Sequence, residues 1–297
     1  MKADLQAYLS GISRADQRFL ARGISLVENG HPFGQSLLLN IKPKADVPVI
    51  GVTGPPGAGK STLVHALVSA LIKEDKRIAI LAVDPSSPFN NGALLGDRIR
   101  MTSLYTHPLV FIRSLASRGA LGGLTEKTIE ITDILRASNF DYIFIETVGV
   151  GQSELDIVGL ADLTLLVLVP ESGDDVQQVK SGIMEIADVF IVNKSDRPDS
   201  DKFARALKKS IKFSHKNIPV INVVASGSTG IDRVLPYLKH PLMGDKSKQV
   251  DLIARKAWRL MQQERMRDIN WTEFRQDLVE KMKDQDFNLY SFIHSRT

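Results

Sequence analysis

A glycine-rich segment has the spacing G-x-x-x-x-G-K-S/T and runs Gly54-Pro55-Pro56-Gly57-Ala58-Gly59-Lys60-Ser61. Its glycines let backbone N–H groups approach phosphate oxygens, and a helix that begins here favours anions at its N-terminus. We expect Lys60 to neutralise the β- and γ-phosphates, the Ser61 hydroxyl to bind Mg²⁺, and Thr62 to continue the cradle. A chance glycine-rich turn is the alternative. The apolar strand before the segment and the helix after it favour a nucleoside triphosphate site.

A second segment, Asn193-Lys194-Ser195-Asp196, matches N-K-x-D and follows an apolar run. The Asp196 carboxylate can accept both the ring N–H and the exocyclic amine of guanine, whereas adenine has no ring N–H on that edge. We expect Asn193 to brace neighbouring loops and the Lys194 stem to lie along the purine. After the next run comes Ala225-Ser226-Gly227, where guanine O6 would be contacted, although an ordinary turn explains this match nearly as well. Together these segments favour GTP over ATP.

Carboxylates follow two further runs. Glu146-Thr147-Val148-Gly149 stands where related sites carry D-x-x-G, so Glu146 is expected to reach Mg²⁺ through water or to orient the attacking water. The Gly149 N–H would face the γ-phosphate. Asp84 ends another run and Asp97 lies in a glycine-rich loop, and both are candidate metal ligands, with helix capping as the alternative for each. The predicted catalytic residues are thus Lys60, Asp97, Glu146 and Gly149, and the predicted metal ligands are Ser61, Asp84, Asp97 and Glu146.

Val150 follows Gly149, at the place where many regulatory GTPases have a water-positioning glutamine. Intrinsic hydrolysis is therefore expected to be slow, with a partner or a rearranged loop completing the site. Gln152 is a nearby candidate, although a polar loop residue is its commoner role. Three arginines could supply transition-state charge, and the sequence does not choose among Arg98, Arg100 and Arg113.

Seven continuously apolar runs must position these residues, as expected for strands buried on both faces of a parallel sheet. Apolar residues at helical spacing predict helices over Lys60 to Glu74 and over Val176 to Ile186. We therefore predict a doubly wound, mainly parallel α/β domain over residues 47–240. The runs are Val49–Val52, Ile78–Val83, Val110–Ile112, Tyr142–Ile145, Leu163–Val169, Val189–Val192 and Val220–Val224.

The flanks, residues 1–46 and 241–297, are expected to be helical extensions. Ser13-Arg14-Ala15-Asp16 has a capping-box pattern, and Gly30 stands where the following helix should stop. An apolar stripe of Trp271, Phe274, Leu278 and Met282 runs through the C-terminal extension. Such stripes pack on the domain's own surface or, in the sharper interpretation, on another chain. Both extensions are too short to hold a core alone, so they must lean on the domain or on a partner.

Composition excludes several classes of protein. The 297 residues contain no Cys, which rules out disulfides and thiolate metal sites and fits a reducing, cytoplasmic setting. The net charge of +4 comes without a basic block, so nucleic acid is not an expected partner. The longest apolar run, Leu163–Val169, is far shorter than the roughly 18 residues that span a bilayer.

Four stretches together resemble the MeaB/ArgK family, the methylmalonyl-CoA mutase-associated GTPases. They are Gly51–Leu63, Val83–Ser87 followed by Gly96-Asp97-Arg98, Glu146–Glu154 with the specific string E-T-V-G-V-G-Q-S-E, and Asn193–Asp196. The resemblance covers most of the chain, including the helix at Ala21–Glu28. Pro55-Pro56 is stiffer than the family's usual loop, and Ala225–Gly230 matches its base-contact loop only loosely.

This resemblance implies a GTPase that binds GTP, GDP and Mg²⁺ and chaperones an adenosylcobalamin-dependent acyl-CoA mutase, gating cofactor loading and protecting the enzyme. It also implies a homodimer joined through the C-terminal arm, and an extra switch over Pro170–Lys180. The alternative is an accessory ATPase or kinase of lysine/arginine/ornithine transport. A nickel metallochaperone is disfavoured by the absence of Cys, and a protein-targeting GTPase by the absence of a methionine-rich domain and a basic surface.

Overall fold

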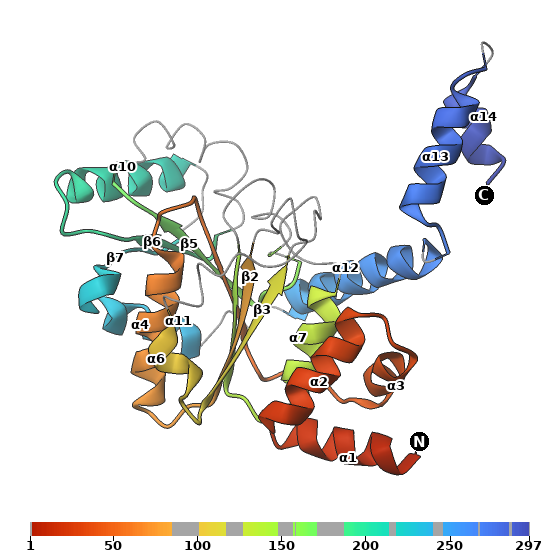
Figure 1. Ribbon diagram of the computed structural model, residues 1–297. Helices are drawn as coiled ribbons and strands as arrows, with labels where there is room; N and C mark the ends of the chain where they lie inside the picture. Colours follow the sequence, from red (N-terminus) through yellow and green to blue (C-terminus); the bar gives the residue numbers. More distant parts are fainter. Residues whose placement is uncertain are drawn as a thin grey trace. The chain divides into compact units, whose positions relative to one another are not determined.

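The strands form a single sheet with helices packed around it (Figure 1). The sheet has seven parallel strands in the order β3-β2-β4-β1-β5-β6-β7. The computed structural model describes residues 2–84, 101–116, 127–147, 157, 159–170, 187–213, 218–239, 246–266, 268–284 and 287–296. The strands are β1 (Val49–Thr53), β2 (Ile78–Asp84), β3 (Val110–Ala116), β4 (Tyr142–Glu146), β5 (Leu163–Leu168), β6 (Val189–Val192) and β7 (Val220–Asn222). All seven predicted strands are confirmed, with ends shifted by a few residues.

Helices cover both faces of the sheet, which confirms the doubly wound arrangement. Residues 165, 167, 189 and 191 of β5 and β6 pack in one cluster with α4 (Lys60–Ile72) and α11 (Leu235–Lys239). The alternate residues 166, 168, 190 and 192 pack with α10 (Ser200–Phe213). Because neighbouring side chains on a strand point to opposite faces, α4 and α10 lie on opposite sides of the sheet. The helix predicted over Lys60 to Glu74 ends at Ile72, and Asp75 three residues later has a left-handed backbone conformation with φ 56°.

Three helices make up the N-terminal extension: α1 (Lys2–Ser13), α2 (Gln17–Glu28) and α3 (Pro32–Asn40). The predicted capping box is wrong, because Ser13 is the last residue of α1 and Asp16 instead caps α2 by accepting the N–H groups of Arg18 and Phe19. The predicted stop at Gly30 is confirmed. Gly30 has φ 65°, and His31 N donates to Leu26 O at 2.9 Å, which closes the helix end in a left-handed turn.

The N-terminal extension is anchored to the sheet by polar contacts. Arg113 of β3 donates to Glu28 Oε2 at 2.7 Å and to Ser25 Oγ at 3.1 Å, both on α2. Helix α2 also packs on α7 (Thr128–Arg136), and Lys44 N donates to Arg136 O at 3.1 Å. This flank therefore leans on the α/β domain, as its length predicts.

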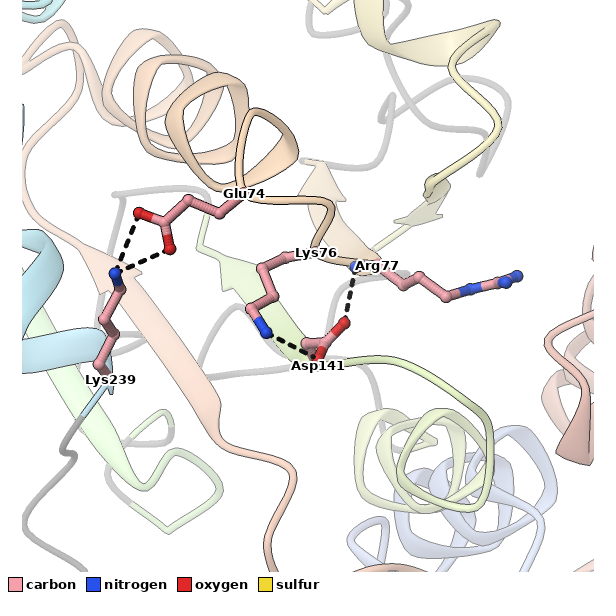
Figure 2. Close-up of polar contacts among 5 residues, drawn as sticks. All are labelled: Glu74, Lys76, Arg77, Asp141 and Lys239. Atoms are coloured by element: carbon pink, nitrogen blue, oxygen red, sulfur yellow. Dashed lines mark hydrogen bonds and ion pairs between the residues drawn. The ribbon is translucent and has the colours of Figure 1, made fainter.

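Ion pairs tie elements together at the amino-terminal ends of β2 and β4 (Figure 2). Lys239 of α11 pairs with Glu74 just after α4, at 2.7 Å. Asp141, just before β4, accepts the backbone N–H of Arg77 at 2.8 Å and pairs with Lys76 at 3.6 Å. In a parallel sheet this edge lies opposite the carboxyl ends of the strands, where ligands collect.

The chain divides into two compact units, Met1–Lys246 and Ser247–Thr297. The C-terminal unit contains α12 (Lys246–Arg265) except for its first residue, α13 (Trp271–Lys281) and α14 (Leu289–His294). Asn270 and Asn288 cap α13 and α14. Phe274 packs on Trp271 and on the buried Phe292, with ring centroids 5.9 and 5.6 Å apart. Among the described helices of the whole chain, none is long and apolar enough to cross a membrane.

Candidate functional site

The predicted site residues follow neighbouring strands at a single edge of the sheet. The glycine-rich loop follows β1, Glu146 ends β4, Asn193 follows β6, and Ala225 lies shortly after β7. Val52 is in register with Glu146, so the loop after β1 begins beside this carboxylate. Parallel strands all present their carboxyl ends on the same side, and the fold thus gathers residues that lie far apart in the sequence.

Glycine is required at two positions of the loop after β1. Gly54 has φ 138°, and a Cβ there would lie 2.1 Å from Val167 O. Gly59 has φ 86°, and a Cβ there would lie 2.4 Å from Asn193 Nδ2. Both positions combine a left-handed backbone with a close approach of another strand's end, which only glycine tolerates. The loop is therefore wedged between β5 and the segment after β6 and leads directly into α4.

Lys60 is the first residue of α4 and is buried, with 6% of its surface exposed. Its ammonium donates hydrogen bonds to the carbonyl oxygens of Gly54 at 2.9 Å and Pro55 at 3.1 Å. The loop thus folds around its own lysine, and the positive end of the α4 dipole lies at the same point. Both features place positive potential where the sequence predicts phosphate binding.

Ser61 and Glu146 meet in the interior, although 85 positions separate them in the sequence. The Ser61 hydroxyl donates to Glu146 Oε1 at 2.6 Å, and both residues are at most 4% exposed. These are hard oxygen donors of the kind that Mg²⁺ binds. No group of three or more His, Cys, Asp or Glu able to hold a metal occurs among the described residues. A nucleotide-borne Mg²⁺ commonly uses only one or two carboxylates plus phosphate oxygens, so the Ser61–Glu146 pair fits such an ion.

Sequence reasoning missed a second buried contact beside this pair. Thr53 and Thr147 are at most 1% exposed, and their Oγ1 atoms lie 2.9 Å apart in a hydrogen bond. Thr53 immediately precedes the glycine-rich loop, and Thr147 immediately follows Glu146. The only sequence signal is their position next to two motifs. The contact joins the base of one functional loop to the base of the other.

Asn193 links the phosphate side of the site to the base side. Its Nδ2 donates to Ala58 O at 2.8 Å, and its Oδ1 accepts the Ala225 N–H at 3.1 Å. The side chain is 2% exposed, so both bonds are made away from solvent. One amide thereby fixes the glycine-rich loop relative to the Ala225-Ser226-Gly227 turn, which is the bracing expected of an asparagine at this position.

The rest of the N-K-x-D segment forms a turn above β6. Lys194 takes positive φ (55°), Ser195 N donates to Val223 O at 3.0 Å, and Ser200 Oγ donates to Ser195 O at 2.8 Å. Asp196 is exposed, as are Ser226 and Gly227 of the neighbouring turn. The carboxylate that is predicted to read guanine and the turn that is predicted to contact O6 are therefore both open to solvent.

Several predicted residues lie outside the described residues, namely Asp97, Gly149, Val150, Gln152, Arg98 and Arg100, together with the helix expected over 176–186 and nearly all of the predicted switch at 170–180. Asp84 ends β2 in register with Ala116, and its side chain is not among those described. Arg113 is engaged by Glu28 and Ser25 on α2, which sets it apart from a transition-state role.

Comparisons with known proteins identify relatives of this chain. A protein of Pyrococcus abyssi named as a GTPase is 44% identical over 236 residues, which cover 77% of this chain and 73% of that protein. The mouse protein named methylmalonic aciduria type A homolog, mitochondrial, is 36% identical over 66% of this chain, and the match spans only 54% of its own length.

The fold also recurs in a solved structure. The crystal structure of an LAO/AO transport system kinase has a TM-score of 0.70 at 23% identity and covers 99% of this chain and 97% of that one, a likeness of fold alone. The sequence profile of the methylmalonyl-CoA mutase-associated GTPase MeaB matches residues 20–285. The chain therefore belongs to the family of methylmalonyl-CoA mutase-associated GTPases.

Proposed function

We propose that this protein binds GTP with Mg²⁺, hydrolyses it slowly, and uses the nucleotide cycle to chaperone an adenosylcobalamin-dependent acyl-CoA mutase in the cytoplasm. The observation that carries the nucleotide part is the pair of hydrogen bonds by which the Asn193 amide joins the glycine-rich loop to the Ala225-Ser226-Gly227 turn. The mutase part rests on the family whose profile matches residues 20–285.

The chemistry follows from groups that the chain itself supplies. Lys60 and the N–H groups of the loop at Gly54–Gly59 would stabilise charge that develops on the phosphates. Ser61 and Glu146 would hold Mg²⁺, with Asp84 and Asp97 as further proposed ligands, and the ion would neutralise phosphate charge. Gly149 would contact the γ-phosphate. Because Val150 cannot orient the attacking water, we expect slow turnover until a partner completes the site.

Lys60→Ala tests the phosphate site. We expect GTP turnover to fall by at least about a hundredfold, because a preorganised charge at the transferred phosphoryl group is lost. Phosphate release at saturating GTP is the measurement. Lys73→Ala, a matched change at the exposed C-cap of the same helix α4, is expected to leave turnover unchanged. Normal turnover in Lys60→Ala would contradict the assignment.

The proposed interaction with a mutase is tested by immobilising this protein and capturing proteins that bind to it, once with GDP and once with a non-hydrolysable GTP analogue. We expect an acyl-CoA mutase to be retained in a nucleotide-dependent way, because a chaperone cycle requires two states of different affinity. Failure to retain any acyl-CoA mutase in either state would refute the chaperone role and leave the GTPase role standing.

A second candidate is an accessory ATPase or kinase of amino-acid transport, the role that the name of the similarly folded LAO/AO transport system kinase suggests. Nucleotide preference separates the two. Faster hydrolysis of ATP than of GTP at equal concentrations would overturn the guanine assignment and favour this second candidate.

We also propose a homodimer formed through the C-terminal unit. Val250, Ile253, Trp258 and Met261 of α12 are each at least 50% exposed. Exposed apolar patches of this kind mark interaction sites in proteins that remain in solution. Helix α12 of a second copy would cover these side chains with its own apolar side chains.

A further inference from the structure

A hollow of about 390 Å³ lies beside strand β7, and its size is in the range of small-molecule sites. Helix α10 forms one wall, and the η3–α11 segment on the opposite face of the sheet forms the other (Figure 1). The short helix η3 spans Ile231–Arg233. The α10 residues in the wall recur every three or four positions and so share one side of the helix. The lining residues are Asp201, Ala204, Arg205, Lys208, Val220, Ile221, Asn222, Arg233 and Tyr237.

The segment after β7 covers the end of the strand beside this hollow. Val224 and Thr229 exchange two backbone hydrogen bonds of 3.0 and 3.2 Å. Gly230 lies against the end of β7, since a Cβ on this glycine would lie 2.5 Å from Asn222 O. The strand edge is therefore occupied by the chain itself, and the hollow suits a compact ligand rather than an added strand. The Ala225-Ser226-Gly227 turn lies within the loop that Val224 and Thr229 close, and it does not line the hollow.

The hollow is positively charged. Arg205 and Lys208 reach it from α10, and Arg233 reaches it from the opposite wall. Its one carboxylate, Asp201, accepts a hydrogen bond from Asn222 Nδ2 at 3.2 Å. None of the three cationic side chains forms an ion pair with another described residue. Cations that line one concave surface without a counter-charge attract an anion.

The types of these cations favour phosphate as the anion. An arginine guanidinium is a planar fork that binds two phosphate oxygens at once, and a lysine ammonium binds phosphate as a compact point charge. A phosphate group carries roughly −1.5 to −2 charge near neutral pH, whereas a carboxylate carries a single charge. Three cations against one carboxylate are therefore matched best by a small molecule that holds two phosphate groups close together.

Both walls are held in place by contacts of their own. Lys239 pairs with Glu74 and ties the end of α11 to the end of α4 (Figure 2). On the other side, Ser200, the first residue of α10, donates to Ser195 O at 2.8 Å. A ligand that enters a preformed hollow has little backbone to order, which favours binding.

We propose that this hollow is a binding site for a small molecule that carries two or more phosphate groups. Arg205 and Lys208 would bind its phosphates from α10 and Arg233 from η3, so a single ligand would bridge the two walls. No lining residue belongs to the glycine-rich loop, to the N-K-x-D segment or to the Ala225-Ser226-Gly227 turn. The inference is therefore independent of the proposed nucleotide site.

The probe is inorganic pyrophosphate, titrated into the full chain and followed by isothermal titration calorimetry. Saturating GDP is present to occupy the proposed nucleotide site, and Mg²⁺ is left out because it would bind the probe. We expect one pyrophosphate to bind per chain, with an affinity that falls as the salt concentration rises. Orthophosphate is expected to bind about tenfold or more weakly, because a single phosphate group reaches fewer of the three cations.

Paired substitutions locate the site on the protein. Arg205→Gln with Arg233→Gln removes one cation from each wall and is expected to weaken pyrophosphate binding by about tenfold or more. Lys202→Gln with Lys209→Gln removes as much charge at exposed positions of α10 that do not line the hollow. This control pair is expected to weaken binding much less. GTP turnover is expected to stay unchanged in both pairs, which separates this result from a failure of the nucleotide assignment.

Four outcomes would overturn the proposal. They are absence of pyrophosphate binding at saturating GDP, equal losses in the two substituted pairs, orthophosphate binding as tight as that of pyrophosphate, and displacement of pyrophosphate by a short glutamate-rich peptide at lower concentration. The last would assign the hollow to an acidic segment of a protein instead of a small molecule.

Discussion

Several polar side chains at the site are buried and form hydrogen bonds across long sequence separations, whereas Asp196 is exposed. Ser61 bonds to Glu146, Asn193 to Ala58 and Ala225, and Thr53 to Thr147. Buried polar groups that find partners make a structure more rigid, whereas one left without a partner costs about 1–3 kcal/mol. The glycine-rich loop and the Ala225-Ser226-Gly227 turn are therefore held relative to each other by the fold itself.

Asp196→Asn tests the base-reading carboxylate. We expect GTP affinity to fall by about tenfold or more and affinity for xanthosine triphosphate to rise, because an amide can donate where xanthine offers an oxygen. Competition binding with a fluorescent nucleotide measures both. Asp199→Asn is the control, an exposed neighbour whose positive φ (63°) asparagine tolerates. Undiminished GTP affinity in Asp196→Asn would mean that the base pocket lies elsewhere.

The pair Thr53–Thr147 is tested by a double-mutant cycle with valine, which keeps the shape and removes the hydroxyl. Each single change is expected to lower the free energy of unfolding by about 1 kcal/mol, because it leaves one buried hydroxyl without its partner. The double variant should lose less free energy of unfolding than the two single variants lose together, and the difference should also be about 1 kcal/mol. Urea unfolding provides the values, and strictly additive losses would refute the coupling.

At the scale of elements, the N-terminal helices are part of the α/β unit. Arg113 of β3 and Glu28 of α2 form an ion pair with 27% and 14% of their side chains exposed. The pair Lys239–Glu74 joins two other elements but is about 40% exposed on both sides. Solvent screens the Lys239–Glu74 pair more strongly than the Arg113–Glu28 pair. The Arg113–Glu28 pair should therefore contribute more to the free energy of unfolding.

We therefore expect Glu28→Gln to lower the free energy of unfolding by about 1–3 kcal/mol, since it removes the counter-charge of a half-buried guanidinium. Lys239→Met should cost less than about 1 kcal/mol. Denaturant unfolding compares the two variants under one set of conditions. Equal losses would show that α2 is not held to β3 by this contact.

At the scale of the whole molecule, most of the large apolar side chains that are exposed among the described residues belong to the C-terminal unit. Within the unit, Phe274 and Phe292 pack together, so part of the predicted stripe is covered by the chain itself. Trp271, by contrast, is 71% exposed, and α12 exposes further apolar side chains. The Phe274–Phe292 contact lies within the C-terminal unit, so packing of the stripe on the α/β domain and packing on another chain both stay predictions.

Ile253→Glu together with Trp258→Glu tests the proposed dimer. These side chains are 66% and 63% exposed in the single chain, so the variant is expected to fold. Analytical ultracentrifugation should find one copy in place of two, because a carboxylate is costly in an apolar interface. Gln262→Glu, at an exposed polar position of the same helix, is expected to leave the dimer intact. An unchanged mass in the double variant would place any dimer contact elsewhere.

Sequence alone determined the features that local chemistry dictates. The glycine-rich loop, the N-K-x-D segment and the seven apolar runs are contiguous, and each carries its own spacing signal, so the doubly wound sheet could be predicted. Local rules failed where two signals compete. Both Ser13 and Asp16 can cap a helix, and only the end of α1 at Ser13 decides in favour of Asp16.

Only the tertiary structure decided which distant groups meet. That Ser61 contacts Glu146, that Asn193 bridges two loops, and that Arg113 faces α2 depend on strand order, which no local pattern encodes. The same holds for the edge position of β7, because a strand lies at an edge only through the arrangement of the other six. Covalent neighbours specify local conformation, whereas a contact between distant residues is specified by packing the whole chain into one sheet and its covering helices.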